Sequence, residues 1–232
     1  MTAAARQGSL WVLLAVALAA PVVHAQVPPT PAEAAQFSAL HAAAYRGDLA
    51  RIASALAGGA AVSGRDARGR TALHVATFAR QREAIRKLAQ AGADLGALEN
   101  DRYDAVTIAA VADDEETLAV LLSHGASAQL TTSRYDGTAL IAAAHLGHDG
   151  VVRQLIKAGA PLDHVNNLDW TAAIEAVVLG DGGPRHQATL RALVDAGANL
   201  QLADRSGQTP LQLARGRGYG ALVKILESAP RR

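Results

Sequence analysis

Sulfur is nearly absent from this chain. None of its 232 residues is cysteine, and its only methionine is Met1. Without thiols the chain can form no disulfide bond, supply no thiolate nucleophile and bind no metal through cysteine. The folded protein must therefore be held together by packing and hydrogen bonds alone.

Aromatic residues are scarce, and neither sign of charge is in excess. Phe, Trp and Tyr make up 3% of the residues, and 22 basic residues against 21 acidic ones leave a formal charge of +1. The charges form no blocks, whereas a nucleic-acid-binding protein usually carries a basic face, so we expect no DNA or RNA partner. Half of the residues are apolar, with Ala and Leu prominent, which favours closely packed helices over a β-sandwich or barrel.

Long hydrophobic runs are also missing, apart from one near the N-terminus. Leu10 to Ala20 form an apolar stretch that follows the positive charge of Arg6, and Ala25 is a small residue suited to signal-peptidase cleavage. The stretch is shorter than the roughly 20 apolar residues that span a bilayer. We therefore expect residues 1–25 to be a signal peptide cut before Gln26, which would leave the protein in the periplasm or secreted, with no stable membrane insertion. A retained membrane anchor is the alternative.

The segment after this signal is rich in proline. Residues 26–35 include Pro28, Pro29 and Pro31. Because consecutive prolines favour extended chain and disfavour helix, we expect a short, stiff linker there. The folded part is predicted to begin near Ala32.

A short pattern then recurs six times: Thr or another helix-starting residue, an Ala-Leu-His-like sequence, and a final Ala. Successive copies begin 33, 33, 34, 33 and 38 residues apart. A nearly constant period of this length is the signature of a stacked array of helical units. The copies begin at Ser38, Thr71, Asp104, Thr138, Thr171 and Thr209, and we place the units near residues 36–68, 69–101, 102–135, 136–168, 169–206 and 207–230.

A Gly-Ala pair marks the same point in successive units. It follows the start by 21 residues in the first four units and by 26 in the fifth. Glycine at this point can take the positive φ that ends a helix. Between the two markers lies a second apolar stripe at helical spacing. Each unit is therefore predicted to be helix, turn, helix, glycine stop and extended connector, and its helices can bury their apolar faces only by stacking on neighbours.

These residues resemble ankyrin repeats, whose first helix opens with Thr-Pro-Leu-His and whose second helix ends in Leu-Leu-x-x-Gly-Ala. Thr71-Ala72-Leu73-His74 and Thr209-Pro210-Leu211 are the best matches, and Asp66 and Asp204 each precede by three residues the glycine of a hairpin turn. The resemblance covers roughly residues 36–229. It implies an all-α solenoid of about six helix-turn-helix units with short β-hairpin connectors, or fingers, and protein binding along the fingers and first helices.

Two units depart from the family pattern. The third has Asp104 and Thr107 where the family has Thr and His. The fifth has Ala173 in place of Leu and an enlarged loop over residues 181–186. We expect the fold to persist in both units.

Each candidate catalytic or metal-binding group also has a structural explanation. His41 and His74 belong to the repeat motif, where the imidazole ties the helix start to neighbouring groups. His145 and His148 could reach one metal ion, but no third ligand stands at useful spacing. We therefore predict no metal, no cofactor and no catalytic residue.

Two further clusters are explained in the same way. The acidic residues 113–116 open a second helix, where exposed amide groups stabilise negative charge. The glycine-rich residues 180–183 lack the preceding strand and the Lys-Ser/Thr of a phosphate-binding loop.

Aromatic and arginine residues instead indicate a binding surface. Counted from each motif, most aromatic residues after the signal fall at finger bases, on a finger tip or late on a first helix, the positions that the resemblance assigns to partner contact. Both residue types are enriched among interface hot spots. The predicted partner-binding residues are Phe37, Tyr45, Arg46, Arg68, Arg70, Phe78, Tyr103, Tyr135, His145, Trp170 and Arg217. The alternative is that these rings pack between adjacent fingers.

The sequence thus predicts an exported, monomeric protein that binds another protein along its concave face and fingers. The resemblance to some exported bacterial ankyrin proteins adds an alternative, an accessory or protective factor for an exported enzyme such as a catalase. A remote alternative is an enzyme that uses the enlarged loop, with His186 and Arg185 as its reactive groups.

Overall fold

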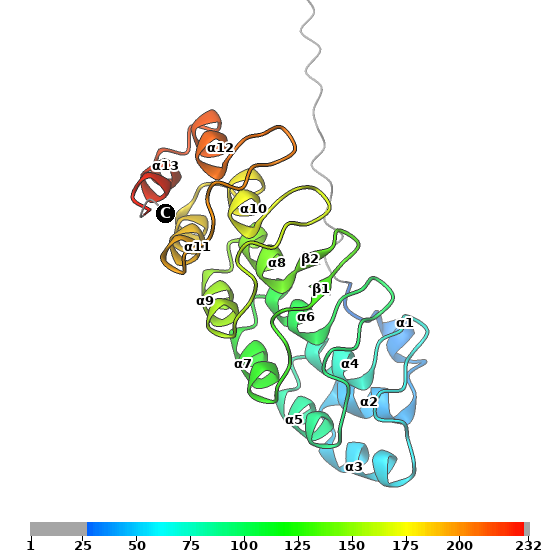
Figure 1. Cartoon of the computed structure of the whole chain (residues 1–232). Coiled ribbons are helices and arrows are strands. Elements are labelled where there is room, and N and C mark those ends of the chain that lie inside the picture. Colours follow the sequence, from blue (N-terminus) through cyan, green and yellow to red (C-terminus); the bar gives the residue numbers. More distant parts are fainter. Residues whose placement is uncertain (1–26, 230–232) are drawn as a thin grey trace, which may run out of the picture.

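Residues 27–229 are described by a computed structural model, in which pairs of helices stack into one elongated array (Figure 1). A four-residue helix, α1 (Pro31–Ala34), precedes six such pairs, which confirms the predicted all-α solenoid. The first helices of the pairs are α2 (Ala39–Arg46), α4 (Ala72–Phe78), α6 (Ala105–Val111), α8 (Ala139–Leu146), α10 (Ala172–Val178) and α12 (Pro210–Gly216). The second helices are α3 (Leu49–Ala57), α5 (Arg82–Gln90), α7 (Glu115–Ser123), α9 (Asp149–Lys157), α11 (Pro184–Asp195) and α13 (Gly220–Glu227).

Every first helix begins directly after the residue that opens its repeat motif. The side chain of that residue accepts a hydrogen bond from the backbone N–H three positions later, a cap that is worth about 1 kcal/mol. The glycines of the Gly-Ala pairs have φ between +82° and +91°, the left-handed conformation predicted for the helix stop. The caps and the stops explain why the same two helices form in each unit.

In the first two units a histidine of the motif links the unit to the next finger. In the second unit, Nδ1 of His74 lies 2.8 Å from the hydroxyl of Thr71, and Nε2 donates to the backbone carbonyl of Tyr103 over 3.1 Å. His41 bonds Ser38 and the carbonyl of Arg70 in the same way. The structural role predicted for the two histidines is confirmed.

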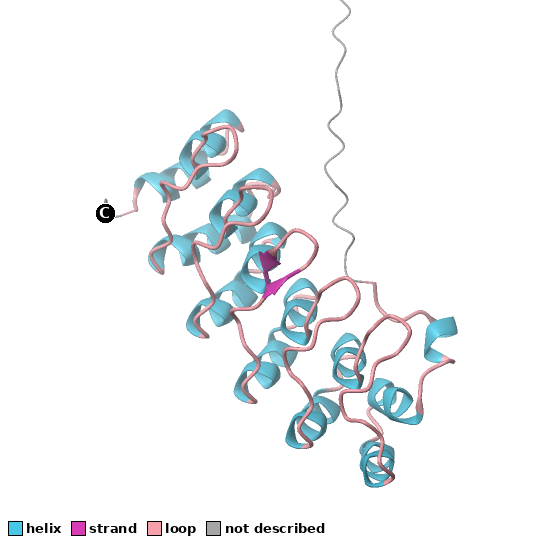
Figure 2. Ribbon diagram, turned by 45° about the vertical axis from the view of Figure 1, so that its right-hand side comes forward, coloured by secondary structure: helices cyan, strands magenta, loops and turns pink. Residues whose placement is uncertain are grey.

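The fingers are loops that project from one side of the array, and one of them contains paired strands (Figure 2). Strands β1 (Thr131–Thr132) and β2 (Gly137–Thr138) pair antiparallel, with Thr131 opposite Thr138. The other fingers are closed by backbone and side-chain bonds together: in the first, the backbone N–H of Asp66 donates to the carbonyl of Arg70, and Oδ1 of Asp66 accepts from the backbone of Arg68 and Arg70. The predicted hairpin geometry is therefore kept, while regular strand pairing is confined to one finger of the described chain.

The core is one continuous apolar cluster along the array. It is built from fully buried side chains of both helices in each unit and from the alanines that let the helices approach closely. Leu73, Leu88, Leu121 and Leu155 are among its largest members. The helices of each unit bury their apolar faces against the helices of adjacent units, so the stability of each unit depends on its neighbours.

The N-terminal segment differs from the prediction. The predicted linker, residues 26–35, is not extended throughout, because Pro31–Ala34 form helix α1, close to Ala32, where we expected the folded part to begin. Pro31 is at the first turn, where its missing N–H costs no hydrogen bond, and Thr30 and Glu33 form a capping box. Glu33 then pairs with Arg68 at 2.8 Å, which attaches α1 to the first finger.

The enlargement of the fifth unit also differs from the prediction of a loop over residues 181–186. Helix α11 begins at Pro184 and runs for 12 residues, so the insertion lengthens the helix as well as the turn. The acidic residues 113–116 lie where we predicted, with Asp114 as the N-cap of α7.

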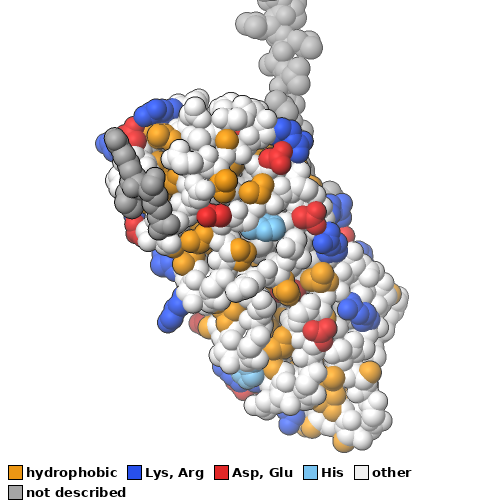
Figure 3. All heavy atoms as spheres, viewed as in Figure 1, with side chains coloured by type: hydrophobic (Ala, Val, Ile, Leu, Met, Phe, Trp, Pro, Cys, Tyr) orange, Lys and Arg blue, Asp and Glu red, His pale blue; other side chains and the backbone are white. Residues whose placement is uncertain are grey.

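The surface charge, the length of the helices and the N-terminal segment bear on the predicted partners and location of the protein. In the view of Figure 3, basic side chains are scattered mainly along the edges beside acidic ones, so this face has no continuous basic surface of the kind that binds nucleic acid. None of the helices within residues 27–229 is long and apolar enough to cross a membrane. The predicted signal peptide, residues 1–25, lies outside the described residues.

Candidate binding groove

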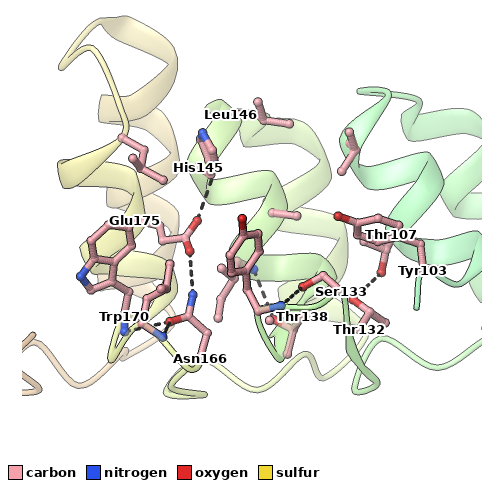
Figure 4. Close-up of a pocket in the computed structure, with 17 residues that line it drawn as sticks. Tyr103, Thr107, Thr132, Ser133, Thr138, His145, Leu146, Asn166, Trp170 and Glu175 are labelled. Carbon is pink, nitrogen blue, oxygen red and sulfur yellow. Dashed lines mark hydrogen bonds and ion pairs between the residues drawn. The ribbon is translucent and has the colours of Figure 1, made fainter. Parts of the chain in front are cut away.

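An apolar hollow of about 120 Å³ lies between the fingers and the first helices of the third, fourth and fifth units. We call it the groove. Three fingers, residues 99–103, 133–137 and 166–170, form one wall, and α6, α8 and α10 form the other (Figure 4). The main side chains are Tyr103, Tyr135, Leu168 and Trp170 from the fingers, and Val111, Ile141, His145, Leu146, Glu175 and Leu179 from the helices.

The groove brings together four of the eleven predicted partner-binding residues. Tyr103, Tyr135 and Trp170 come from three successive fingers, and His145 comes from the last turn of α8. Tyr103 and Trp170 occupy equivalent positions, one residue before the motif, and the repeated geometry places them on one line along the array, with Tyr135 and His145 between them.

The other predicted residues lie elsewhere. Phe37 and Tyr45 pack edge to face within the first unit, with ring centroids 5.9 Å apart. Phe78 and Arg68 line a smaller hollow next to Tyr103. Arg46 is exposed on α2, and Arg217 is exposed at the end of α12, where it donates to the carbonyl of Val178.

The predicted role of Arg70 in partner binding requires a correction. We predicted it on the partner face, but the side chain is only 4% exposed. Its Nε donates to Asp66 at 2.7 Å, and the guanidinium lies 5.7 Å from the centre of the Phe37 ring. Because these contacts use its charge inside the first finger, Arg70 stabilises the fold and is not available to a partner.

Glu175 is a groove residue that the sequence reasoning missed. It stands four positions after Thr171, in the middle of α10, and is 6% exposed. In every other unit the equivalent residue is apolar, and an alignment of the units would have revealed the exception. The equivalent residues are Ala42, Val75, Ile108, Ala142 and Leu213.

Asn166 connects Glu175 to the finger. Its side-chain N–H donates to Oε1 of Glu175 over 2.8 Å, and its oxygen accepts from the backbone N–H groups of Leu168 and Trp170, both at 3.0 Å. The same amide therefore shapes the finger that carries Trp170 and holds one oxygen of the buried carboxyl.

Burial controls the ionisation of this part of the groove. It raises the pKa of Glu175 to about 8, against the opposing effect of the Asn166 hydrogen bond. Burial, together with the nearby His186 and His148, lowers the pKa of His145. Although Nδ1 of His145 lies 3.6 Å from Oε2 of Glu175, both groups are thus neutral at pH 7 and form no ion pair.

The side chains considered for metal binding or catalysis are engaged in structural contacts. His148 Nδ1 donates to the carbonyl of Ala110 over 2.9 Å. Arg185 pairs with Asp113 at 2.8 Å, and His186 donates through Nε2 to the carbonyl of His145. Among residues 27–229 no three His, Asp or Glu side chains are grouped so that they could hold a metal ion. The groove presents an apolar surface with a few polar groups, an arrangement that suits binding.

Comparisons with known proteins agree with this architecture. A family profile described as ankyrin repeats, in three copies, matches residues 1–99 and 106–204. The ankyrin repeat protein YahD of Escherichia coli (strain K12) is 32% identical over 188 residues, which span 81% of this chain and 93% of YahD.

Solved structures are similar over most of the chain. An ankyrin repeat domain from Acinetobacter baumannii AYE is 44% identical, with a TM-score of 0.77 over 82% of this chain and 96% of that domain. The ankyrin repeat domain of Bcl-3, of the IkappaB protein family, is 27% identical, with a TM-score of 0.73 over 84% of this chain and 87% of that domain.

Proposed function

Because this chain belongs to the ankyrin-repeat family, we propose that it is an exported adaptor that holds a partner protein in the groove. Ankyrin repeats generally mediate binding to other proteins, and the relatives share a fold that serves interaction rather than catalysis. Repeat surfaces change partners without changing fold, so the groove itself must supply the specificity.

The observation that carries the proposal is the alignment of Tyr103, Tyr135 and Trp170 along one apolar hollow. Aromatic side chains bury much area with few rotatable bonds, and binding hot spots concentrate in such pockets. The rings are only partly exposed in the free protein, so they are already held in place. A partner would therefore lose little free energy to ordering them.

Export is the second part of the proposal. It is supported by the charged start, the apolar stretch and the small residue at position 25, which together are typical of a signal peptide. An adaptor exported in this way would meet its partner in the periplasm or outside the cell.

Site-specific photocrosslinking in the native organism tests the proposal. A photoreactive amino acid at Leu146, at the groove wall, should capture a distinct protein, which mass spectrometry then identifies. The same group at Lys157, exposed at the end of α9, is the matched control. Equal products at the two positions, or none at Leu146, would contradict binding in the groove. Capture of an exported enzyme would specify the adaptor as an accessory factor.

A further inference from the structure

One carboxyl group interrupts the apolar surface that the first helices present to the groove. Glu175 occupies a position where the other five units have Ala, Val, Ile or Leu. Burying a carboxyl group costs free energy that an apolar side chain would not cost. The fold uses this carboxyl group to bond Asn166 of the finger, so the question is what its second oxygen serves.

Only one of its two oxygens is used by the fold. Oε1 accepts the hydrogen bond from Asn166, whereas Oε2 has no hydrogen-bond partner among the described residues. Its nearest polar neighbour, Nδ1 of His145, is 3.6 Å away, which is too long for a hydrogen bond. Figure 4 shows Glu175 between His145 and Asn166, with Trp170 beside it. A carboxyl oxygen without a partner therefore faces the groove next to an aromatic ring.

Within residues 27–229 the array brings no cation to this oxygen. Helix α8 contributes the neutral His145, and the finger contributes Asp169, which pairs with Arg205 of the next finger at 2.8 Å. From α11, His186 donates to the carbonyl of His145, and Arg217 after α12 donates to a backbone carbonyl. The remaining titratable groups are the phenols of the groove tyrosines. No Lys or Arg from the described residues lines the groove.

We propose that the groove receives an arginine side chain of the partner protein, with its guanidinium against Oε2 of Glu175 and its planar face against Trp170. This inference rests on the proposed function, because it specifies what the partner places in the groove. A guanidinium group binds carboxylates through its N–H groups and stacks on aromatic rings. Because it is weakly hydrated, it loses little hydration free energy on entering an apolar hollow. A lysine ammonium is more strongly hydrated, and an acidic side chain would meet the carboxyl with the wrong charge.

Proton release should accompany this binding. With a pKa of about 8, Glu175 carries its proton at pH 7 in the free protein. A bound guanidinium favours the carboxylate and lowers its pKa, so binding expels the proton. The affinity should therefore rise with pH, by nearly tenfold per pH unit below about pH 7, and level off above about pH 8.

Tryptophan fluorescence provides a local readout. The chain has two tryptophans, Trp11 and Trp170, so in the Trp11→Phe variant of the full chain Trp170 is the only one, whether or not residues 1–25 are removed. The probes are two blocked pentapeptides of alanine and leucine with a central arginine or its uncharged isostere citrulline. The arginine peptide should change Trp170 fluorescence with an affinity at least about tenfold higher than the citrulline peptide.

Variants identify the group responsible. Glu175→Gln retains the Asn166 contact but cannot ionise, so it should abolish both the preference for arginine and the pH dependence. Asp101→Asn removes an exposed carboxylate from the finger that carries Tyr103 and should change neither. Calorimetry at pH 7 in buffers of different ionisation enthalpy should detect release of close to one proton with the parent chain and none with Glu175→Gln.

The outcomes separate this inference from the proposed function. Equal binding of the arginine and citrulline peptides would overturn the arginine site while leaving the groove as a binding surface. An arginine preference that survives Glu175→Gln would likewise overturn it. Failure of both peptides to bind up to about 10 mM would contradict the arginine site. Crosslinking at Leu146 would then decide separately whether a partner uses the groove.

Discussion

Nε2 of His74 donates a hydrogen bond to the backbone carbonyl of Tyr103, 29 residues further along the chain. A side chain on the first helix of one unit therefore fixes the backbone at the base of the next finger. Tyr103 stands at one end of the groove, so the position of this ring depends on a bond made in the neighbouring unit. The same relationship joins His41 to Arg70 in the preceding unit.

The first prediction concerns His74 and acid. Burial lowers its pKa to about 4 from an ordinary value of 6.5, so the unfolded chain binds its proton first as the pH falls. Stability should then decrease between about pH 6.5 and pH 4, with His74 contributing up to about 3 kcal/mol of the loss. Urea melts across this range should show a shallower slope for His74→Gln. His124→Gln, at the end of α7, is the control, and an unchanged slope in the His74 variant would contradict the assignment.

Glu175 should have the opposite pH dependence. Its pKa is raised to about 8, so the unfolded carboxyl loses its proton from about pH 4.5 upward while the folded one keeps it. The free energy of unfolding should therefore decrease as the pH rises from about 4.5 to about 8. Glu175→Gln should stabilise the chain more at pH 8 than at pH 5, with a difference of about 1 to 4 kcal/mol. Glu116→Gln, an exposed carboxylate on α7, should show no such trend. A gain that is the same at both pH values would refute the raised pKa.

A third prediction compares the stability of an inner unit with that of a terminal unit. Leu73 is 1% exposed in an inner unit, and Leu73→Ala should lower the free energy of unfolding by about 2 to 5 kcal/mol. Leu226→Ala in the sixth unit should cost less, because among the described residues α13 has a neighbouring unit on one side only. Denaturation in urea gives both values. A larger cost for the terminal variant would show that the units have been assigned wrongly.

The groove residues give a fourth prediction. Tyr103→Ala and Trp170→Ala should each leave the fold largely intact and weaken partner binding by about 2 kcal/mol, a loss of about thirtyfold in affinity. Thermal melting and affinity must be measured on the same samples. If the rings serve only to pack adjacent fingers, the variants will melt earlier and bind in proportion to the folded fraction. Full affinity in a well-folded variant would remove that residue from the binding surface.

Processing is the fifth prediction. The exported protein should begin at Gln26, because Val23 and Ala25 suit the cleavage site. Intact-mass measurement of protein recovered from the exported fraction checks this directly. A product that still carries residues 1–25 would support a retained anchor instead.

The fold could be predicted from sequence because its determinants are local and repeated. Thr71 and His74 lie within one helical turn, and the glycine of each Gly-Ala pair adopts positive φ whatever the distant chain does. α1 was not foreseen, because the same prolines that disfavour a helix interior are tolerated at its first turn. The lengthened α11 was missed for the same reason, since Pro184 begins a helix where the sequence suggested a loop.

The binding site was less predictable because burial depends on contacts far apart in sequence. Tyr103 and Trp170 could be placed by their position in the repeat, and the groove contains both. Arg70 could not, because its burial depends on the shape of the first finger and on Glu33, which approaches from α1. An alignment of the units could have singled out Glu175, but its burial and its unused oxygen depend on the finger and helices packed around it.

The ion pair between Arg185 and Asp113 spans 72 residues. In a linear array each unit normally contacts only the units beside it, so opening can spread from an end one unit at a time. Arg185 on α11 reaches past the fourth unit to the third and also approaches Asp149 on α9 at 3.4 Å. The pair is partly exposed and worth no more than about 1 kcal/mol, yet that is enough to change an opening equilibrium about fivefold. This contact therefore couples the opening of units three to five, which together form the groove, more tightly than the stacking of neighbouring units alone would.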